Sequence, residues 1–293
     1  MSTNIHTVVG LVADTNTGQI REHNEDDYII IPDVIATESR DFGNDSYVLG
    51  SAGCLLAVAD GMGGAAAGEV ASQSTTYIIK KYLATNKYEK PTPQEIKYVF
   101  EQLIIHSHKN LLKLIESYPE YKGMGTTLVM GWIVDYRAYI CWVGDSRCYH
   151  FRQNQGTRLA TEDHSWVWEM VKKGLLTQEQ AAVHEYRNII TQCIGDSEHP
   201  PTPSFVSIEL ERGDKLLFCS DGLNTMVSDE DINWHLSQTV NVKLTAQQLI
   251  AAANQAGGED NITVAIIEVL EKPIESYTGS KQSIWKKMKN MFK

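Results

Sequence analysis

The sequence predicts an α+β fold in which antiparallel sheets are flanked by helices. Strand-length runs rich in Val, Ile, Leu and aromatic residues recur along the chain, as buried strands require. They span residues 7–13, 28–31, 54–59, 128–134, 138–143, 205–210, 215–219 and 262–270. Only three residues separate the runs 128–134 and 138–143, which permits a hairpin but not the crossover helix of a parallel pair. This order favours α+β layering over a doubly wound sheet.

Four segments between the strand-like runs are predicted to be helices. They are residues 68–83, 93–117, 229–237 and 245–255. In the second segment, apolar residues recur with the 3.6-residue period of one helix face, from Ile96 to Ile115. Pro93 suits the first turn of that helix, and Thr92 suits its N-cap.

The charge balance limits the kind of partner. The 293 residues carry 26 Lys and Arg against 37 Asp and Glu, a formal net charge of -11. Because a polyanion would be repelled, nucleic-acid binding by the body of the chain is disfavoured. Residues 271–293 hold six Lys and two Glu, and the remaining 270 residues carry a net charge of -15. Such a surplus of carboxylates suits a solvated surface or cation-binding sites.

The five cysteines indicate a reducing compartment. Cys54, Cys141, Cys148, Cys193 and Cys219 are odd in number and never spaced as Cys-x-x-Cys, so neither a disulfide framework nor a zinc site is indicated. The first residues lack the basic and apolar regions of a secretion signal, and no run approaches the roughly 18 apolar residues that span a bilayer. We therefore expect a cytoplasmic protein.

Asp residues at the ends of predicted strands are the most informative feature. Four of them lie where an apolar run begins or ends, three beside a Gly. They are Asp60, Asp145, Asp221 and Asp260. A single Asp-Gly is usually a turn, but four such residues together with the acidic run 24–27 suggest a cluster. Oxygen-only ligands favour Mg²⁺ or Mn²⁺ over zinc or copper.

Seven short motifs follow one another in the order and spacing of a known family. They are Arg21-Glu22-His23-Asn24-Glu25-Asp26, Asp60-Gly61-Met62-Gly63-Gly64, Gly125-Thr126-Thr127, Gly144-Asp145-Ser146-Arg147, Asp163-His164-Ser165, Ser220-Asp221-Gly222 and Asp260-Asn261. Over roughly residues 8–270 the chain resembles the type 2C metal-dependent Ser/Thr protein phosphatases, particularly their bacterial single-domain form. The resemblance implies a four-layer α-β-β-α sandwich of two antiparallel sheets, with residues 1–270 as the catalytic domain.

The resemblance also implies two bound Mn²⁺ or Mg²⁺ ions. By position, the Asp60 carboxylate would bridge both ions and the Gly61 carbonyl would ligate one of them. Asp221 and Asp260 would complete the protein ligands of the other ion. Asp145 looks like the ligand of a weaker third metal.

Further roles follow from the first motif. Glu25 and Asp26 would hold metal-bound waters from outside the ligand set. The planar guanidinium of Arg21 would bind the substrate phosphate. The reaction implied is direct hydrolysis of phosphoserine or phosphothreonine in proteins, in which a hydroxide bridging the metals attacks phosphorus and no phosphoenzyme forms.

A competing motif runs from Cys141 to Arg147 and matches the Cys-x5-Arg phosphate loop of Cys-dependent phosphatases. Three features oppose it. Ile140 stands where those enzymes usually have His, Asp145 would repel the phosphate, and Cys141 lies in an apolar strand-like run. We therefore expect Cys141 to be a core residue.

Three positions depart from the pattern of many relatives. Met62 replaces a His that is proposed as general acid, so the proton donor is expected to be a metal-bound water. His23 and His164 are nearby, but a single polar His in a loop is more often structural. Thr225 replaces an Asp and weakens the expected third-metal site, and residues 190–193 replace a segment that often carries Arg.

Two segments between the motifs have no assigned chemistry. Residues 166–203 correspond in position to the mobile flap of the family, where substrate choice is expected to be set. Residues 32–53 are long and polar and fit either a β-hairpin insertion or a loop.

The C-terminal tail, residues 271–293, is basic and amphipathic. Within 281–293, Ile284, Trp285, Met288 and Phe292 lie on one arc and Lys residues on the rest. This pattern suits peripheral docking on an anionic membrane or an acidic partner. It also suits a frayed tail or a short helix packed on the acidic body of the same chain.

Three functions remain open from the sequence. The leading one is an Mn²⁺/Mg²⁺-dependent phosphatase of phosphorylated proteins, a monomer that opposes a bacterial Ser/Thr kinase. A catalytically silent phosphoprotein-binding module would be expected to have lost part of the set Arg21, Asp60, Asp221 and Asp260, which is intact. A third keeps the chemistry but acts on phospho-His, phospho-Arg or small phosphoesters.

Overall fold

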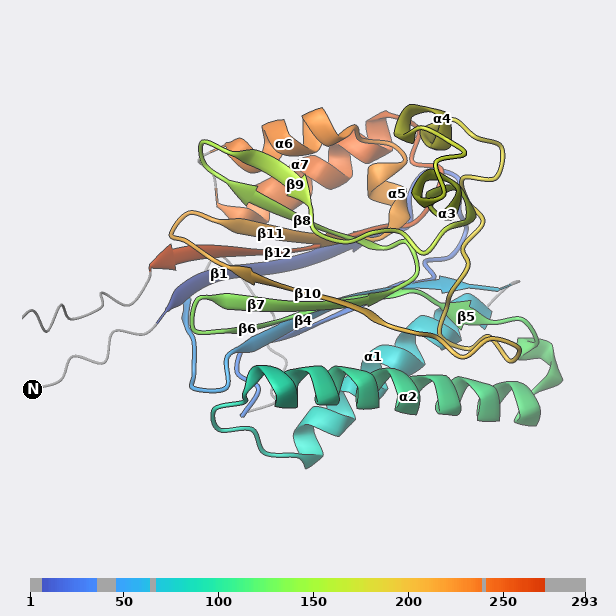
Figure 1. Cartoon of the computed structure of the whole chain (residues 1–293), viewed down its shortest axis with the longest axis horizontal. Coiled ribbons are helices and arrows are strands. Elements are labelled where there is room, and N and C mark those ends of the chain that lie inside the picture. Colours follow the sequence, from blue (N-terminus) through green and yellow to red (C-terminus); the bar gives the residue numbers. More distant parts are fainter. Residues whose placement is uncertain (1–6, 36–45, 64–66, 239–240, 272–293) are drawn as a thin grey trace, which may run out of the picture.

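Two antiparallel sheets lie face to face between two layers of helices (Figure 1). The computed structural model describes residues 7–35, 46–63, 67–238 and 241–271. The strands are β1 (Val8–Asn16), β2 (Asp26–Ile31), β3 (Ser46–Val48), β4 (Cys54–Met62), β5 (Gly125–Thr126), β6 (Leu128–Val134), β7 (Arg137–Val143), β8 (Arg147–Arg152), β9 (Gly156–Leu159), β10 (Ser204–Glu209), β11 (Lys215–Cys219) and β12 (Ile262–Glu271). The helices are α1 (Ala67–Thr85), α2 (Pro93–Ser117), η1 (Pro119–Tyr121), α3 (Trp166–Lys172), α4 (Gln178–Ala182), α5 (Asp221–Asn224), α6 (Asp229–Ser237) and α7 (Val242–Gln255).

The strand order confirms the predicted α-β-β-α sandwich. One sheet has the order β3-β1-β12-β11-β8-β9, and the other has β10-β7-β6-β4-β2 with β5 paired to β4. Helices α1 and α2 cover the second sheet, and α6 and α7 cover the first (Figure 1). The hairpin β6–β7 turns at Asp135, which has a positive φ of 54°, as the short separation predicted.

Three apolar cores hold the four layers together. Side chains that alternate in direction along single strands contribute to these cores. In β4, Leu55 packs toward α1 and α2, whereas the next residue, Leu56, packs between the sheets. In β11, Phe218 lies between the sheets and Leu217 faces α7. Side chains on a strand point to opposite faces with period two, so each central strand contributes to two cores.

Helices α2 and α7 begin at capping residues. Thr92 caps α2: its hydroxyl accepts from the Glu95 N–H at 3.3 Å, and the Glu95 carboxylate accepts from the Thr92 N–H at 2.7 Å. Helix α7 begins three residues before the predicted start, because Asn241 accepts from the Leu244 N–H at 2.9 Å and so provides an earlier cap.

Several short elements were not predicted. Strands β8 and β9 form a hairpin that turns through Asn154 and Gly156, both with positive φ. Strand β3 lies within the segment 32–53 and pairs with β1. Two short helical stretches were expected within 166–203, and the structure has α3 and α4 there. Residues 36–45 of the polar segment and 272–293 of the tail lie outside the described residues.

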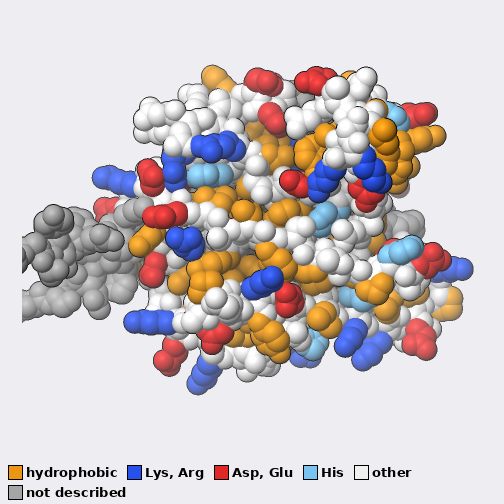
Figure 2. All heavy atoms as spheres, viewed as in Figure 1, with side chains coloured by type: hydrophobic (Ala, Val, Ile, Leu, Met, Phe, Trp, Pro, Cys, Tyr) orange, Lys and Arg blue, Asp and Glu red, His pale blue; other side chains and the backbone are white. Residues whose placement is uncertain are grey.

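Charged side chains of both signs are interspersed over the face seen in Figure 2. The acidic surplus is therefore not gathered into one patch on that face. Across the described ranges, the helices are too short or too polar to cross a membrane.

Candidate functional site

The predicted Asp residues converge because several strands begin or end at one edge of the sandwich. Asp26 at the start of β2 stands directly opposite Asp60 near the end of β4 in the antiparallel register. Asp221 opens α5 just after β11, and its carboxyl group shares a side-chain hydrogen bond with that of Asp60. Asp260 precedes β12, the neighbour of β11. The structure thus brings together carboxylates that are up to 234 positions apart in the chain.

Burial and mutual repulsion make these carboxyl groups hard to ionise. Burial raises the pKa of Asp26 to about 7 and that of Asp221 to about 6, the nearby acidic groups adding to the effect. Burial, followed by repulsion from Asp26, Asp221 and Asp145, raises the pKa of Asp60 well above its usual range. Burial also raises the pKa of Asp145 to about 8. Such a cluster is stabilised by any group that neutralises its charge.

One oxygen in the cluster has no protein partner. The Ser220 hydroxyl donates to Asp26 Oδ2 at 2.7 Å, but Asp26 Oδ1 is buried and has no hydrogen bond in the described structure. A buried acceptor without a partner costs about 1–3 kcal/mol. An all-oxygen donor set with an unsatisfied carboxylate oxygen fits a hard divalent cation and its bound waters.

The side chains alone do not form a complete metal-binding site. Among the described residues, no three His, Cys, Asp or Glu side chains lie close enough together to qualify as a metal-binding group. Mg²⁺ is usually bound through only one or two carboxylates and keeps several waters, so the arrangement is compatible with such ions.

Arg21 lies at the rim of the cluster and contacts Asp260. Its Nη2 is 2.7 Å from Asp260 Oδ2, and the two side chains are 50% and 35% exposed. An exposed ion pair of this kind is weak, about 0–1 kcal/mol. The guanidinium is therefore available to an anion that arrives from solvent.

Asn261 positions the loop that carries Arg21 and Glu25. Its Nδ2 donates to the carbonyl oxygens of Thr17 and His23, both at 2.9 Å, and its Oδ1 accepts from the Glu25 N–H at 2.7 Å. Asn261 belongs to the motif Asp260-Asn261, but no role was predicted for it. An amide after Asp and before a strand was the available signal, since it can satisfy donors and acceptors at once.

Gly61 makes a close backbone approach possible. Its N–H donates to the Glu25 carbonyl at 3.1 Å, and a Cβ at this position would overlap the carbonyl oxygen of Gly68. The carboxylate of Glu25 accepts from the Gly68 N–H at the start of α1. The Thr126 hydroxyl donates to the Asp60 carbonyl at 2.8 Å, which fixes the loop from the other side.

Asp145 lies in the turn between β7 and β8, beside a network that involves His164. Nδ1 of His164 accepts from the Gly144 N–H at 3.1 Å, and Nε2 lies 3.0 Å from the Ser204 hydroxyl. Both ring nitrogens are thus engaged, which supports the structural interpretation of this His. The Thr225 hydroxyl donates to the Asp221 carbonyl at 2.8 Å, so it is used within its own helix.

The Cys-dependent alternative is excluded by the position of Cys141. This residue is fully buried in β7, and burial raises the pKa of its thiol well above the usual range. Residues 141–147 form a strand and a turn rather than a loop before a helix. A thiol in that position is not a nucleophile.

Comparison with known proteins identifies the family. The model for Protein phosphatase 2C matches residues 39–256, which is most of the chain. The chain belongs to the protein phosphatase 2C family. It is 36% identical to protein phosphatase PhpP of Streptococcus pneumoniae, over 82% of this chain and 95% of that protein. It is 35% identical to a serine/threonine phosphatase of Listeria monocytogenes, over 87% and 93% of the two chains.

Solved structures of serine/threonine phosphatases share the fold. The S. agalactiae serine/threonine phosphatase has a TM-score of 0.78 and 37% identity, covering 89% of this chain and 99% of that one. The catalytic domain of PstP, solved in complex with two manganese ions, has a TM-score of 0.71 and 30% identity, covering 90% and 99%. The predicted family and the predicted α+β fold are therefore both confirmed.

Proposed function

We propose that the chain hydrolyses phosphoserine and phosphothreonine in phosphorylated proteins, with two Mn²⁺ or Mg²⁺ ions as cofactors. The observation that carries this proposal is the convergence of Asp26, Asp60 and Asp221, all with raised pKa, beside Arg21 at one edge of the sandwich. Cations would neutralise these carboxylates, and a cationic site suits a phosphate dianion. Serine/threonine phosphatases among the relatives, and the manganese ions of PstP, support the same reading.

The cation ligands would come from four positions. They would be the Asp60 carboxylate, the Gly61 carbonyl, Asp221 and Asp260. Glu25 and Asp26 would accept hydrogen bonds from waters of the ions, since Asp26 Oδ1 is free of protein partners. Asp145 would contribute to a weaker third site, where Thr225 stands in place of a carboxylate and donates its hydroxyl to the Asp221 carbonyl.

The reaction needs an activated water, charge neutralisation and a proton donor. The ions, when bound, would supply Lewis acidity for the first two. Arg21 would bind the phosphate oxygens as it exchanges Asp260 for the substrate. Asn261 would hold the loop of Arg21 in register with the carboxylates. Met62 offers no proton and His164 has both nitrogens engaged, so water would protonate the leaving alkoxide.

Turnover of two substrates tests the proposal. A phosphothreonine peptide and an aryl phosphate should be hydrolysed with Mn²⁺ and not after chelation. Asp60→Asn should lower kcat/KM by about 100-fold or more for both substrates. Asp135→Asn is the matched control: Asp135 lies in an exposed turn at positive φ, where Asn is well tolerated. Absence of metal-dependent turnover in the wild type would overturn the proposed hydrolysis and favour the silent phosphoprotein-binding alternative.

The target class can be separated in the same assay. A panel of phospho-His, phospho-Arg and phosphothreonine proteins should show preference for phosphothreonine. Faster turnover of the phosphoramidate proteins, or of small phosphoesters alone, would contradict the proposed substrate. Such a result would leave the site assignment intact.

The biological setting is also a proposal. Residues 1–270 would form a monomeric catalytic domain in the cytoplasm, with 166–203 as its flap, opposing a Ser/Thr kinase. Residues 271–293 would bind an anionic membrane or an acidic partner through 281–293. Flotation of the full chain and of residues 1–270 with anionic vesicles tests the membrane version, which equal and negligible binding would exclude.

A further inference from the structure

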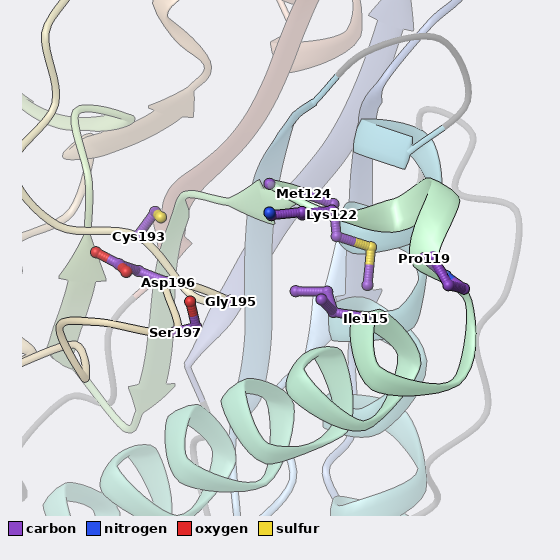
Figure 3. A pocket seen from close by; sticks show the side chains of 9 residues that line it. Ile115, Pro119, Lys122, Met124, Cys193, Gly195, Asp196 and Ser197 are labelled. Carbon is purple, nitrogen blue, oxygen red and sulfur yellow. The ribbon is translucent and has the colours of Figure 1, made fainter.

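A cavity of about 420 Å³ lies where the end of α2, the segment after η1 and residues 193–197, in the last part of the segment 166–203, meet. Figure 3 shows Cys193, Asp196 and Ser197 on one side of it and Ile115 and Met124 on the other. The volume is large enough for a big side chain and is typical of a small ligand site. The sequence places substrate choice somewhere in 166–203, and no individual residue of this cavity has been given a role above.

The cavity is joined to the catalytic loop by a short backbone ladder. Gly61 pairs with Thr126 of β5, and Thr126 pairs in turn with Ile194 through two hydrogen bonds of 2.9 Å. Cys193 and Gly195, which flank Ile194, line the cavity. Adjacent strands lie about 4.8 Å apart, so the cavity wall is about 10 Å from Gly61.

The lining chemistry favours an apolar occupant. Ile115 and Met124 form an apolar wall, and a thioether adapts easily to side chains of different shape. The charged groups, Lys122 and Asp196, come from the exposed segments at the edge. Asp196 is anionic: burial alone would raise its pKa, but the N–H groups of Glu198 and His199 outweigh this and lower the pKa.

A bound peptide could reach the cavity from the catalytic loop. An extended chain advances about 3.3 Å per residue, so a side chain two or three positions from the phosphorylated residue lies about 7–10 Å away. We propose that this cavity is a specificity subsite for a large apolar side chain, two or three residues from the phosphorylated Ser or Thr. The inference rests on the proposed function and deepens it.

A second apolar cavity is less well placed for this role. It has a volume of about 260 Å³ and lies between the start of α2 and β10. Pro93 lines this second cavity and Ile115 lines the first, so the two are about 33 Å apart along the helix. Ser207, which lines the second cavity, therefore offers a matched control for Ser197, which lines the first.

Paired peptides test the subsite. Phosphothreonine peptides with Leu or Ala at positions two and three on either side are compared by kcat/KM. We expect a preference for Leu of about tenfold or more at one of these positions, the usual scale for a few buried methylenes. Ser197→Phe, which fills the cavity, should reduce that ratio to about one. Ser207→Phe, which fills the second cavity, should leave it unchanged.

Two further measurements separate the causes of failure. Turnover of an aryl phosphate, which has no flanking residues, reports whether each variant is folded and active. Ile115→Ala, which removes part of the apolar wall, should lower the Leu preference several-fold even if Ser197→Phe does not fold. Equal turnover of all peptides by a wild type that hydrolyses the aryl phosphate overturns the subsite alone. Failure of the wild type on both substrates removes the proposed function as well.

Discussion

Asp214 gives the sharpest test of the electrostatic reasoning, because its carboxylate is only 1% exposed and fully paired. It lies 2.9 Å from His150 Nε2 and 2.7 Å from Arg152 Nη2, and it accepts from the Glu211 N–H at 2.8 Å. Burial alone would raise its pKa, but these hydrogen bonds outweigh burial and lower the pKa to about 2. Asp214→Asn removes the charge and leaves the shape nearly unchanged.

The magnitude follows from the pKa. A fall from 3.8 to about 2 corresponds to about 2 kcal/mol of stability in the ionised state. The pKa of Asp214 is lower in the folded chain than in the unfolded chain. This contribution to stability is therefore complete at pH values above the pKa in the unfolded chain, and it is lost as the pH falls through the pKa in the folded chain. Asp214→Asn should therefore cost about 2 kcal/mol or more at pH 5. At pH 3 the difference in free energy of unfolding between the wild type and Asp214→Asn should be smaller by about 1 kcal/mol.

Urea unfolding at the two pH values measures both effects. Glu211→Gln is the matched control: its carboxylate lies 2.9 Å from Arg152 Nη1 but is 61% exposed, so its loss should cost less than about 1 kcal/mol. The reasoning is refuted if Asp214→Asn costs no more than this control. It is also refuted if the difference from the wild type does not narrow between pH 5 and pH 3.

Three other predictions follow from packing and hydrogen bonds. Gly131→Ala should lower the free energy of unfolding in urea by about 1–3 kcal/mol, because the methyl group would overlap the buried Phe218 ring; Phe218→Leu should restore part of it. Asn261→Ala should lower peptide kcat/KM by about 10- to 100-fold because it removes the hydrogen bonds that position the Arg21 loop, whereas Asn254→Ala, at a half-buried helix position, should not. Cys141→Ala should keep aryl phosphate turnover; loss of turnover in a folded variant would contradict its core role.

The sequence was sufficient for most of the fold because its central strands are buried on both faces. Runs such as 54–59 and 215–219 are continuous and apolar, and every residue of β11 is buried. Strand β8 was missed because its buried and half-buried residues follow no regular period and include Arg147 and His150. Asn154 and Gly156 marked the turn to β9, but a hairpin of polar strands has no strong hydrophobic period.

Part of the candidate site could be predicted because the sheet topology brings the Asp-bearing ends of several strands to one edge of the sandwich. Apolar runs that stop at Asp60 and Asp221 identify carboxylates at strand ends, and the structure brings both together with Asp26. The contact between Arg21 and Asp260 could not be predicted, since 239 positions separate them and one loop conformation decides it. The role of Asn261 depends on three backbone groups whose positions are fixed only by the tertiary fold.

The carboxylate cluster breaks the rule that buried polar atoms have hydrogen-bond partners. Asp26 is buried opposite Asp60 and retains an oxygen without a partner, at a cost of about 1–3 kcal/mol that a Ser or Asn could reduce. Elsewhere buried charge is paired, as Arg147 is with Asp163 at 2.7 Å and Asp214 with Arg152. Asp163 and Asp214 thus have cationic partners, whereas Asp26 Oδ1 has none among the described residues. The destabilisation is therefore concentrated at the proposed cation site. Functional sites are where such departures are expected, because the missing stabilisation is supplied by what binds there.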